Sequence, residues 1–248
     1  DKVTSFSTRT VSERHYCLVK VRDKDGNQGI GFCYVGSAGG DIAKIAVEQL
    51  LAPKLIGQNS HRSEGLWMDM YNESILQGRA GAVMRGISIL DTASWDLNAR
   101  SVGLPLHQYL GSVVDDRVPA YASGGYYLDG KTPAKLGKEM ESYVKQGFKA
   151  VKMKVGRLSP SEEEARVQAA RKAIGDDILL TLDANNAWRD LPTALEYVRR
   201  FEAYNPYWIE EPFSPDAIDL HAALASLTKI NVATGEMEAG RWRFRELI

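Results

Sequence analysis

Residues 150–155 read Ala-Val-Lys-Met-Lys-Val, a short apolar run with two lysines near its C-terminal end. A run of this length and composition, following Gly147, is typical of a buried β-strand. Because side chains alternate along a strand, Lys152 and Lys154 are expected to share one face while Met153 packs on the other. A buried face rarely accepts two unpaired ammonium groups, since desolvation costs roughly several kcal/mol per ion.

Three further apolar runs follow, and each leads to an acidic residue. Asp183 ends ILLTLD, Glu210 lies within YWIEEP, and Glu236 follows INVATG, at steps of 29, 27 and 26 residues counted from Lys154. A strand, a helix and two loops occupy roughly 25 to 30 residues, so equal steps place these residues at the same end of neighbouring parallel strands. In parallel sheets and barrels that end carries the chemistry.

Each acidic residue also has a simpler explanation when taken alone. Asp183 suits a helix cap, Glu210 or Glu211 an ion-pair partner, and Glu236 an exposed loop residue. The joint spacing favours a shared site over these separate roles. Strand alternation further predicts that Glu211 points to the opposite face from Glu210.

The chain changes its pattern near residue 115. Residues 1–115 predict an α+β domain: a hairpin from HYCLVKVRD and NQGIGFCYVG, then helices over 41–51, 60–76 and 80–100. Residues 116–248 predict alternating strands and helices, with strands beginning at about residues 118, 149, 178, 207 and 230. Helix starts are indicated by Thr132-Pro133, by the capping box from Ser159 to Glu162, and by Asp190.

Composition excludes several classes of function. A net charge of −1 gives no electrostatic footprint for nucleic acid. The dense basic stretch at residues 241–245 is interpreted as a helix with a solvated face. No apolar run approaches the ~20 residues that span a bilayer, and no signal-peptide pattern opens the sequence. Cys17 and Cys33 are interpreted as reduced thiols in paired strands of a cytoplasmic protein.

Three converging carboxylates without His or Cys are hard oxygen ligands that suit Mg²⁺ or Mn²⁺ better than a structural zinc. Such a cation can hold a substrate carboxylate and stabilise the dianion formed when the α-proton is removed. The base would be a neutral amine. Two neighbouring ammonium groups lower each other's pKa by repulsion, and a bound cation adds to this effect, which predicts that one lysine of the pair can be neutral near physiological pH.

Together, Lys-x-Lys, Asp-x-Asn, Trp-Ile-Glu-Glu-Pro and Gly-Glu, in this order, resemble the motifs of the enolase superfamily. Within it, the glutamate at position 236 is similar to the third ligand of the mandelate racemase subgroup, since the muconate-lactonizing subgroup usually has aspartate there. The resemblance implies a (β/α)₈ TIM-type barrel with an N-terminal α+β capping domain, of which about five βα units are present. It also implies a homo-oligomer.

The resemblance implies a role for each motif residue. Asp183, Glu210 and Glu236 would bind Mg²⁺, Lys154 would be the base on one face of the substrate, and Lys152 would contact the substrate carboxylate. Asn185 would approach the substrate. Substrate specificity would come from capping-domain loops, here residues 5–14 and 36–40, with Ser123 and Tyr126 as further candidates. Ordinary turn and core roles remain open for each of these candidates.

The mandelate racemase subgroup also uses an Asp-His pair from its sixth and seventh strands as the opposite base, and no residue of this sequence matches that pair. We interpret all four histidines, His15, His61, His107 and His221, as structural or solvated. The sequence is therefore expected to be part of a longer chain, with an open sheet edge after the fifth strand.

We expect Mg²⁺-assisted abstraction of the proton α to a carboxylate in a small-molecule substrate, followed by dehydration of an acid sugar. Racemisation of a 2-hydroxy acid is the alternative outcome, because it needs a base on the other face in place of an acid that expels the β-hydroxyl. A Schiff-base aldolase with Lys154 as nucleophile leaves the three acids unexplained. An inactive metal-binding remnant is the non-enzymatic alternative.

Overall fold

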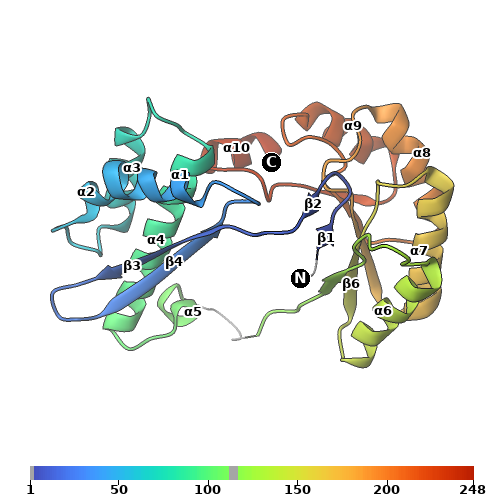
Figure 1. Cartoon of the computed structure of the whole chain (residues 1–248), viewed down its shortest axis with the longest axis horizontal. Helices are drawn as coiled ribbons and strands as arrows, with labels where there is room; N and C mark the ends of the chain where they lie inside the picture. Colours follow the sequence, from blue (N-terminus) through green and yellow to red (C-terminus); the bar gives the residue numbers. More distant parts are fainter. Residues whose placement is uncertain (1–2, 112–116) are drawn as a thin grey trace. The chain divides into compact units, whose positions relative to one another are not determined.

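The computed structural model describes residues 3–111 and 117–248, and the chain divides into two compact units (Figure 1). The barrel unit comprises the described residues up to Ser12, then Pro119–Glu238 and Phe244–Ile248. The capping unit comprises the described residues of Glu13–Val118 together with Ala239–Arg243. The described residues up to Ser12 therefore belong with a sheet that begins more than 100 residues later in the sequence.

The capping unit contains the predicted hairpin, formed by β3 (Tyr16–Arg22) and β4 (Gln28–Tyr34) in antiparallel register. Its helices are α1 (Gly40–Ile45), the π-helix η1 (Ala46–Leu51), α2 (Ala52–Leu55), α3 (Ser63–Glu73), α4 (Gly81–Ser101) and α5 (Leu106–Tyr109). The single helix predicted over 41–51 is instead an α-helix that widens into a π-helix. A new segment begins at α2, where Pro53 has no backbone N–H to donate to the preceding turn.

Strand β4 lies directly on helix α4 (Figure 1). A Cβ atom at Gly31 would lie 2.0 Å from the carbonyl oxygen of Ile89, and one at Gly29 would lie 2.0 Å from that of Ala93. Only glycine permits this approach of two backbones. The contact closes a core that contains Leu51, Met70 and Ile87.

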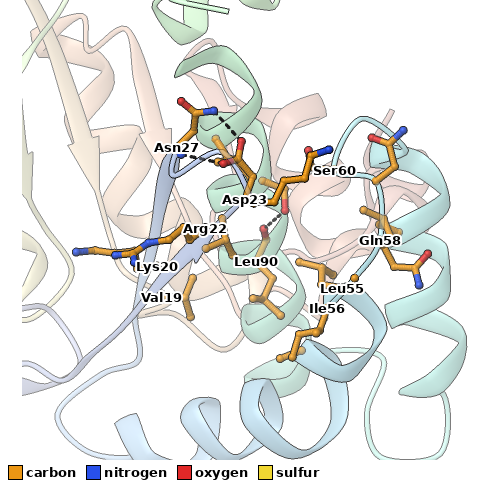
Figure 2. A pocket seen from close by; sticks show the side chains of 18 of the residues that line it. Val19, Lys20, Arg22, Asp23, Asn27, Leu55, Ile56, Gln58, Ser60 and Leu90 are labelled. Carbon is orange, nitrogen blue, oxygen red and sulfur yellow. Dashed lines mark hydrogen bonds between the residues drawn. The ribbon is translucent and has the colours of Figure 1, made fainter. Parts of the chain in front are cut away.

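The capping unit also contains a cavity of about 1140 Å³ (Figure 2). Val19 and Val21 of β3 line it together with Leu55, Leu66 and Leu90, while polar side chains lie around the β3–β4 turn. No residue predicted to act in catalysis, metal binding or substrate binding lines this cavity.

The barrel unit is built on five parallel strands in sequential order: β5 (Ala122–Gly124), β6 (Ala150–Lys154), β7 (Leu179–Asp183), β8 (Trp208–Glu210) and β9 (Asn231–Ala233). Its helices are α6 (Pro133–Lys145), α7 (Pro160–Ile174), α8 (Leu191–Phe201) with the 3₁₀ turn η2 (Glu202–Tyr204), and α9 (Ile218–Leu227). Helices α6, α7 and α8 lie on one side of this sheet (Figure 1). The predicted βα alternation is confirmed, and α10 (Arg241–Leu247) forms at the predicted basic stretch.

Helix starts in the barrel unit follow the predicted capping residues. Thr132 accepts a hydrogen bond from the N–H of Lys135, and Asp190 accepts one from that of Thr193. Ser159 and Glu162 form the capping box at the start of α7. These caps satisfy N–H groups that have no partner within their own helix.

The apolar core of the barrel unit lies between the sheet and its helices. Val151, Met153, Leu180, Leu182 and Ile209 are fully buried there, which leaves the alternate residues of β6, β7 and β8 on the other face. Among the described residues, no helix is long and apolar enough to cross a membrane.

Candidate active site

The register of the parallel sheet brings the predicted residues into one row. Lys154 of β6 pairs with Asp183 of β7, Asp183 pairs with Glu210 of β8, and Glu210 pairs with Ala233 of β9. All of them stand at the C-terminal ends of their strands, as the equal sequence spacing predicted. Lys152 lies two residues earlier on the same face as Lys154, in register with Ser123 of β5.

Both lysines are buried and paired with carboxylates. Lys152 Nζ donates to both oxygens of Glu210, at 3.0 and 2.9 Å, and lies 3.3 Å from Oδ2 of Asp183. Lys154 Nζ donates to the same Asp183 oxygen at 2.5 Å. Asp183 is 1% exposed, and its second oxygen accepts a hydrogen bond from the N–H of Asn185. The two ammonium groups therefore share Asp183.

In the metal-free protein, Lys152 is not the member of the lysine pair whose pKa is lowered. Burial by itself lowers the pKa of this amine, but the hydrogen bond to Glu210 and the negative charge of Asp183 outweigh burial and raise the pKa above its ordinary value. The prediction that one lysine of the pair is neutral refers to the metal-bound protein and stays a prediction.

Glu236 differs from the other two predicted ligands in its exposure and its contacts. It lies in an exposed turn three residues after the end of β9, whereas Asp183 and Glu210 are engaged by the lysines. Within residues 3–111 and 117–248, no three His, Cys, Asp or Glu side chains are grouped so that they could hold a metal ion. The ligand set Asp183, Glu210 and Glu236 therefore stays a prediction.

Glu211 does not follow the strand alternation assumed for it. Strand β8 ends at Glu210, and Glu211 has a left-handed backbone with φ 45°, which ends the alternation of faces. Its side chain is 1% exposed, and neither carboxylate oxygen accepts a well-formed hydrogen bond from the described residues, although the side chain of Asn186 lies nearby. Burial, together with the charges of Glu236, Asp183 and Glu210, raises the pKa of Glu211 to about 7. Glu211 was expected to point away from Glu210, yet the charges of Glu210 and the other two acids affect its pKa.

Two side chains close to predicted ligands in the sequence, Glu211 and Asn185, carry buried oxygens of the kind that a hard cation binds. Besides Glu211, the side-chain oxygen of Asn185 is buried and unpaired within the described part of the chain. Asn185 and Asn186 both have left-handed backbones, a conformation that asparagine tolerates better than most residues. Carboxylate and amide oxygens are the donors that Mg²⁺ prefers, so the residues present fit this cation.

A segment near the N-terminus covers Lys154. Residues 4–11 form a short hairpin, β1 (Thr4–Ser5) with β2 (Thr10–Val11), that belongs to the barrel unit. The hydroxyl of Ser7 donates to the carbonyl of Val155, and that of Thr8 donates to the carbonyl of Asn185. This segment is therefore attached to the ends of both β6 and β7.

The aromatic rings of Phe6 and Tyr126 lie beside Lys154. Their rings meet edge to face at 5.4 Å, and Lys154 Nζ lies 5.3 Å from the centre of the first ring and 5.5 Å from that of the second. Tyr126 was predicted as a substrate contact. Phe6 was included only as part of the 5–14 loop, because a lone aromatic residue in a polar segment carries no periodic signal.

The four histidines lie outside the row formed by Lys154, Asp183 and Glu210. His15, His61 and His107 belong to the capping unit, and His221 is buried on α9 with Nδ1 2.8 Å from the carbonyl oxygen of Ala217.

Comparison with known families matches both parts of the chain. Residues 2–111 match the N-terminal domain model of mandelate racemase and muconate lactonizing enzyme, and residues 135–248 match the enolase C-terminal domain-like model.

Two curated relatives are dehydratases of sugar acids. Arabinonate dehydratase of Saccharolobus solfataricus is 36% identical over 84% of this chain and 55% of its own length. The L-talarate/galactarate dehydratase of Salmonella typhimurium is 34% identical over 95% of this chain and 58% of its own length. The chain thus spans little more than half the length of these relatives.

Among solved structures, a racemase from Streptomyces coelicolor with bound magnesium superposes with a TM-score of 0.92 at 30% identity. The match covers 98% of this chain and 68% of that one.

Proposed function

This chain belongs to the mandelate racemase and muconate lactonizing enzyme family of the enolase superfamily, and we propose that it removes the proton α to the carboxylate of an acid sugar and then expels the β-hydroxyl group. The product would be a 2-keto-3-deoxy acid. The observation that carries the proposal is the in-register row of Lys154, Asp183 and Glu210, with both lysines buried against carboxylates. This row supports the proposal, because the reaction needs a base and cation-binding oxygens close together, and the C-terminal end of a parallel sheet is where such sites lie.

Asp183, Glu210 and Glu236 are proposed to hold Mg²⁺, with Mn²⁺ as a substitute. When bound, the cation supplies positive charge against the substrate carboxylate and the negative charge that develops on it. The racemase whose structure contains magnesium supports this choice of metal. The buried unpaired oxygens of Glu211 and Asn185 add negative potential beside the predicted ligands.

Lys154 is proposed to take the α-proton as a neutral amine. The C–H electron pair moves into the substrate carboxylate as the proton passes to Nζ. A general acid then protonates the β-hydroxyl, which leaves as water while the electron pair returns to form the C2–C3 double bond, and the resulting enol becomes the keto acid. Lys152 would hold the substrate carboxylate through its ammonium group. Asn185, Ser123 and Tyr126 are proposed substrate contacts, and Ser123 is exposed on the strand position in register with Lys152.

Dehydration is favoured over racemisation by the two curated relatives, which act on arabinonate and on talarate and galactarate. The same first step would serve a 2-hydroxy-acid racemase, which is the second candidate and is supported by the solved racemase structure. The two outcomes separate after proton removal, because racemisation returns a proton to the other face of the same carbon.

The protein is further proposed to act in the cytoplasm as a homo-oligomer on a small carboxylate, without nucleic acid or membrane partners. Cys17 and Cys33 lie opposite each other in the hairpin register as free thiols, which supports a reducing compartment.

A screen of five- and six-carbon aldonates and aldarates with Mg²⁺ tests the proposed reaction. We expect a 2-keto-3-deoxy product from at least one acid sugar, and loss of the product on addition of EDTA. Recovery of substrate with an inverted α-carbon and no keto acid would instead support racemisation. Inactivation by borohydride in the presence of substrate would indicate a Schiff base and contradict the proposal. Mg²⁺ binding without exchange of any α-proton would support the non-enzymatic alternative, an inactive metal-binding remnant.

A further inference from the structure

A buried ion pair lies on helix α7, directly behind the strand that carries Lys154. Glu163 is 0% exposed and Arg166, one helical turn later, is 5% exposed. Arg166 Nη1 donates to Oε2 of Glu163 at 2.7 Å. The other oxygen of Glu163 and the other donors of Arg166 are directed to the backbone at the edge of the candidate site.

Glu163 binds the loop that follows β6. Its Oε1 atom accepts hydrogen bonds from three successive backbone N–H groups, those of Gly156, Arg157 and Leu158, each at 3.0 Å. The loop turns sharply at Gly156, which has φ 99° and where a Cβ atom would lie 2.6 Å from that of Ala187. One carboxylate oxygen therefore holds the tight turn that begins two residues after Lys154.

Arg166 binds the ends of two strands at once. Nη1 donates to the carbonyl oxygen of Lys154 at 2.9 Å, and Nη2 donates to that of Gly125, just after β5, at 2.8 Å. The guanidinium carbon lies 4.1 Å from the centre of the Tyr127 ring. The side chain thus fixes the backbone of Lys154 itself relative to the neighbouring strand.

Tyr127 completes the cluster. Its hydroxyl donates to Oε1 of Glu163 at 2.5 Å, and burial together with the charge of Glu163 raises the pKa of Tyr127, which keeps the hydroxyl protonated as a donor. Through its own N–H, Tyr127 also binds the carbonyl of Ser5 in the hairpin that covers Lys154.

A stability role alone explains this arrangement poorly. Buried ion pairs recover little or no net stability, because desolvation of both charges offsets their attraction, and apolar residues of similar size often serve as well. Here the donors and acceptors converge on the backbone around one lysine, and geometric precision at a reacting group has a large effect on rate.

We propose that Glu163 and Arg166 are positioning residues for Lys154, which set the place of its Nζ atom by fixing the end of β6 and the turn that follows. This inference rests on the proposed function, in which Lys154 is the base. Neither side chain would contact the substrate.

The test compares Arg166→Lys and Glu163→Gln with the matched control Glu164→Gln. Glu164 is the next residue on α7 and pairs at the surface with Arg200 at 2.9 Å. Lysine keeps the charge of Arg166 but cannot reach both carbonyl groups, whereas glutamine keeps an oxygen for the three N–H groups. The readouts are kcat and KM for α-proton exchange in D₂O across the acid-sugar panel, the melting temperature, and hydrogen exchange at the amides of Gly156, Arg157 and Leu158.

We expect Arg166→Lys to lower kcat by about 100-fold with little change in KM. The variant should still be folded and show a cooperative melting transition. Glu163→Gln should retain more of the activity than Arg166→Lys, and Glu164→Gln should match the wild type. Amide protection at residues 156–158 should fall in Glu163→Gln and stay unchanged in Glu164→Gln.

An unchanged kcat in Arg166→Lys would overturn the positioning role. So would a loss of activity in Arg166→Lys and Glu163→Gln that only follows their loss of folded protein. Absence of α-proton exchange in the wild type would contradict the proposed function. In that case, amide protection that is the same in Glu163→Gln and the wild type would independently refute the anchoring of the turn.

Discussion

The Nζ atom of Lys154 lies 2.5 Å from Oδ2 of Asp183, the residue directly opposite it in the parallel register. The proposed base and a predicted Mg²⁺ ligand thus contact each other, and Lys152 contacts the same oxygen at 3.3 Å. An ammonium group and Mg²⁺ would compete for this carboxylate. If Asp183 is one of the residues that hold the proposed cation, Lys152 and Lys154 would lose this pairing, and Lys154 would be free to act on the substrate.

Alanine at Asp183, Glu210 or Glu236 should each weaken Mg²⁺ binding severely, because each removes one of three proposed oxygen ligands. Lys154→Ala should bind Mg²⁺ at least as tightly as the wild type, because it removes a competing cation. Isothermal titration calorimetry measures all four variants. Glu141→Ala is the control, since Glu141 pairs with Lys145 on the surface of α6. Wild-type Mg²⁺ affinity in all three ligand variants would contradict the assignment.

Glu211 should make the metal-free protein less stable as pH rises. Its pKa is about 7 in the folded protein against an ordinary value of 4.5, so the folded state binds the proton more tightly than the unfolded state. This stabilisation is complete below about pH 4.5 and is lost as pH rises through about 7; the difference corresponds to roughly 3 kcal/mol.

Urea unfolding in EDTA between pH 5 and pH 8 measures this effect. The free energy of unfolding should decline across the range in the wild type and in Glu141→Gln, and the decline should be much smaller in Glu211→Gln. An identical decline in all three proteins would show that a different group titrates.

Gly31→Ala should destabilise the capping unit, because a Cβ atom there would lie 2.0 Å from the carbonyl oxygen of Ile89 and would force β4 away from α4. We expect a loss of about 1–3 kcal/mol or more. Gly40→Ala is the control, since its Cβ would find no atom nearer than 3.6 Å. Denaturant unfolding compares the two, and equal stabilities would refute the close packing of β4 on α4.

Much of the barrel unit follows from the sequence, because strand alternation and the spacing of βα units are local and periodic signals. Those signals place Lys154, Asp183 and Glu210 at one end of the sheet, and the register confirms it. The pairing of lysines with carboxylates was missed, since it depends on which side chains the register sets opposite each other.

Two other features lie beyond periodic signals. Glu211 leaves the strand pattern through one left-handed backbone angle, which no propensity of glutamate indicates. Glu163 and Arg166 look like ordinary surface charges in a helix rich in Glu and Arg. Their burial becomes evident only when α7 is packed behind β6 and the backbone groups of Lys154 and Gly156 are in place.

The α-proton exchange of an acid sugar in D₂O, followed by NMR in wild type and Lys154→Ala with Mg²⁺ bound, tests the central claim most directly. The account predicts exchange on one face of the substrate in the wild type, and a rate lower by about 10²–10⁴-fold in Lys154→Ala despite retained Mg²⁺. Lys154→Arg should not restore exchange, because a guanidinium stays protonated. Undiminished exchange in Lys154→Ala would contradict the assignment of Lys154 as the base.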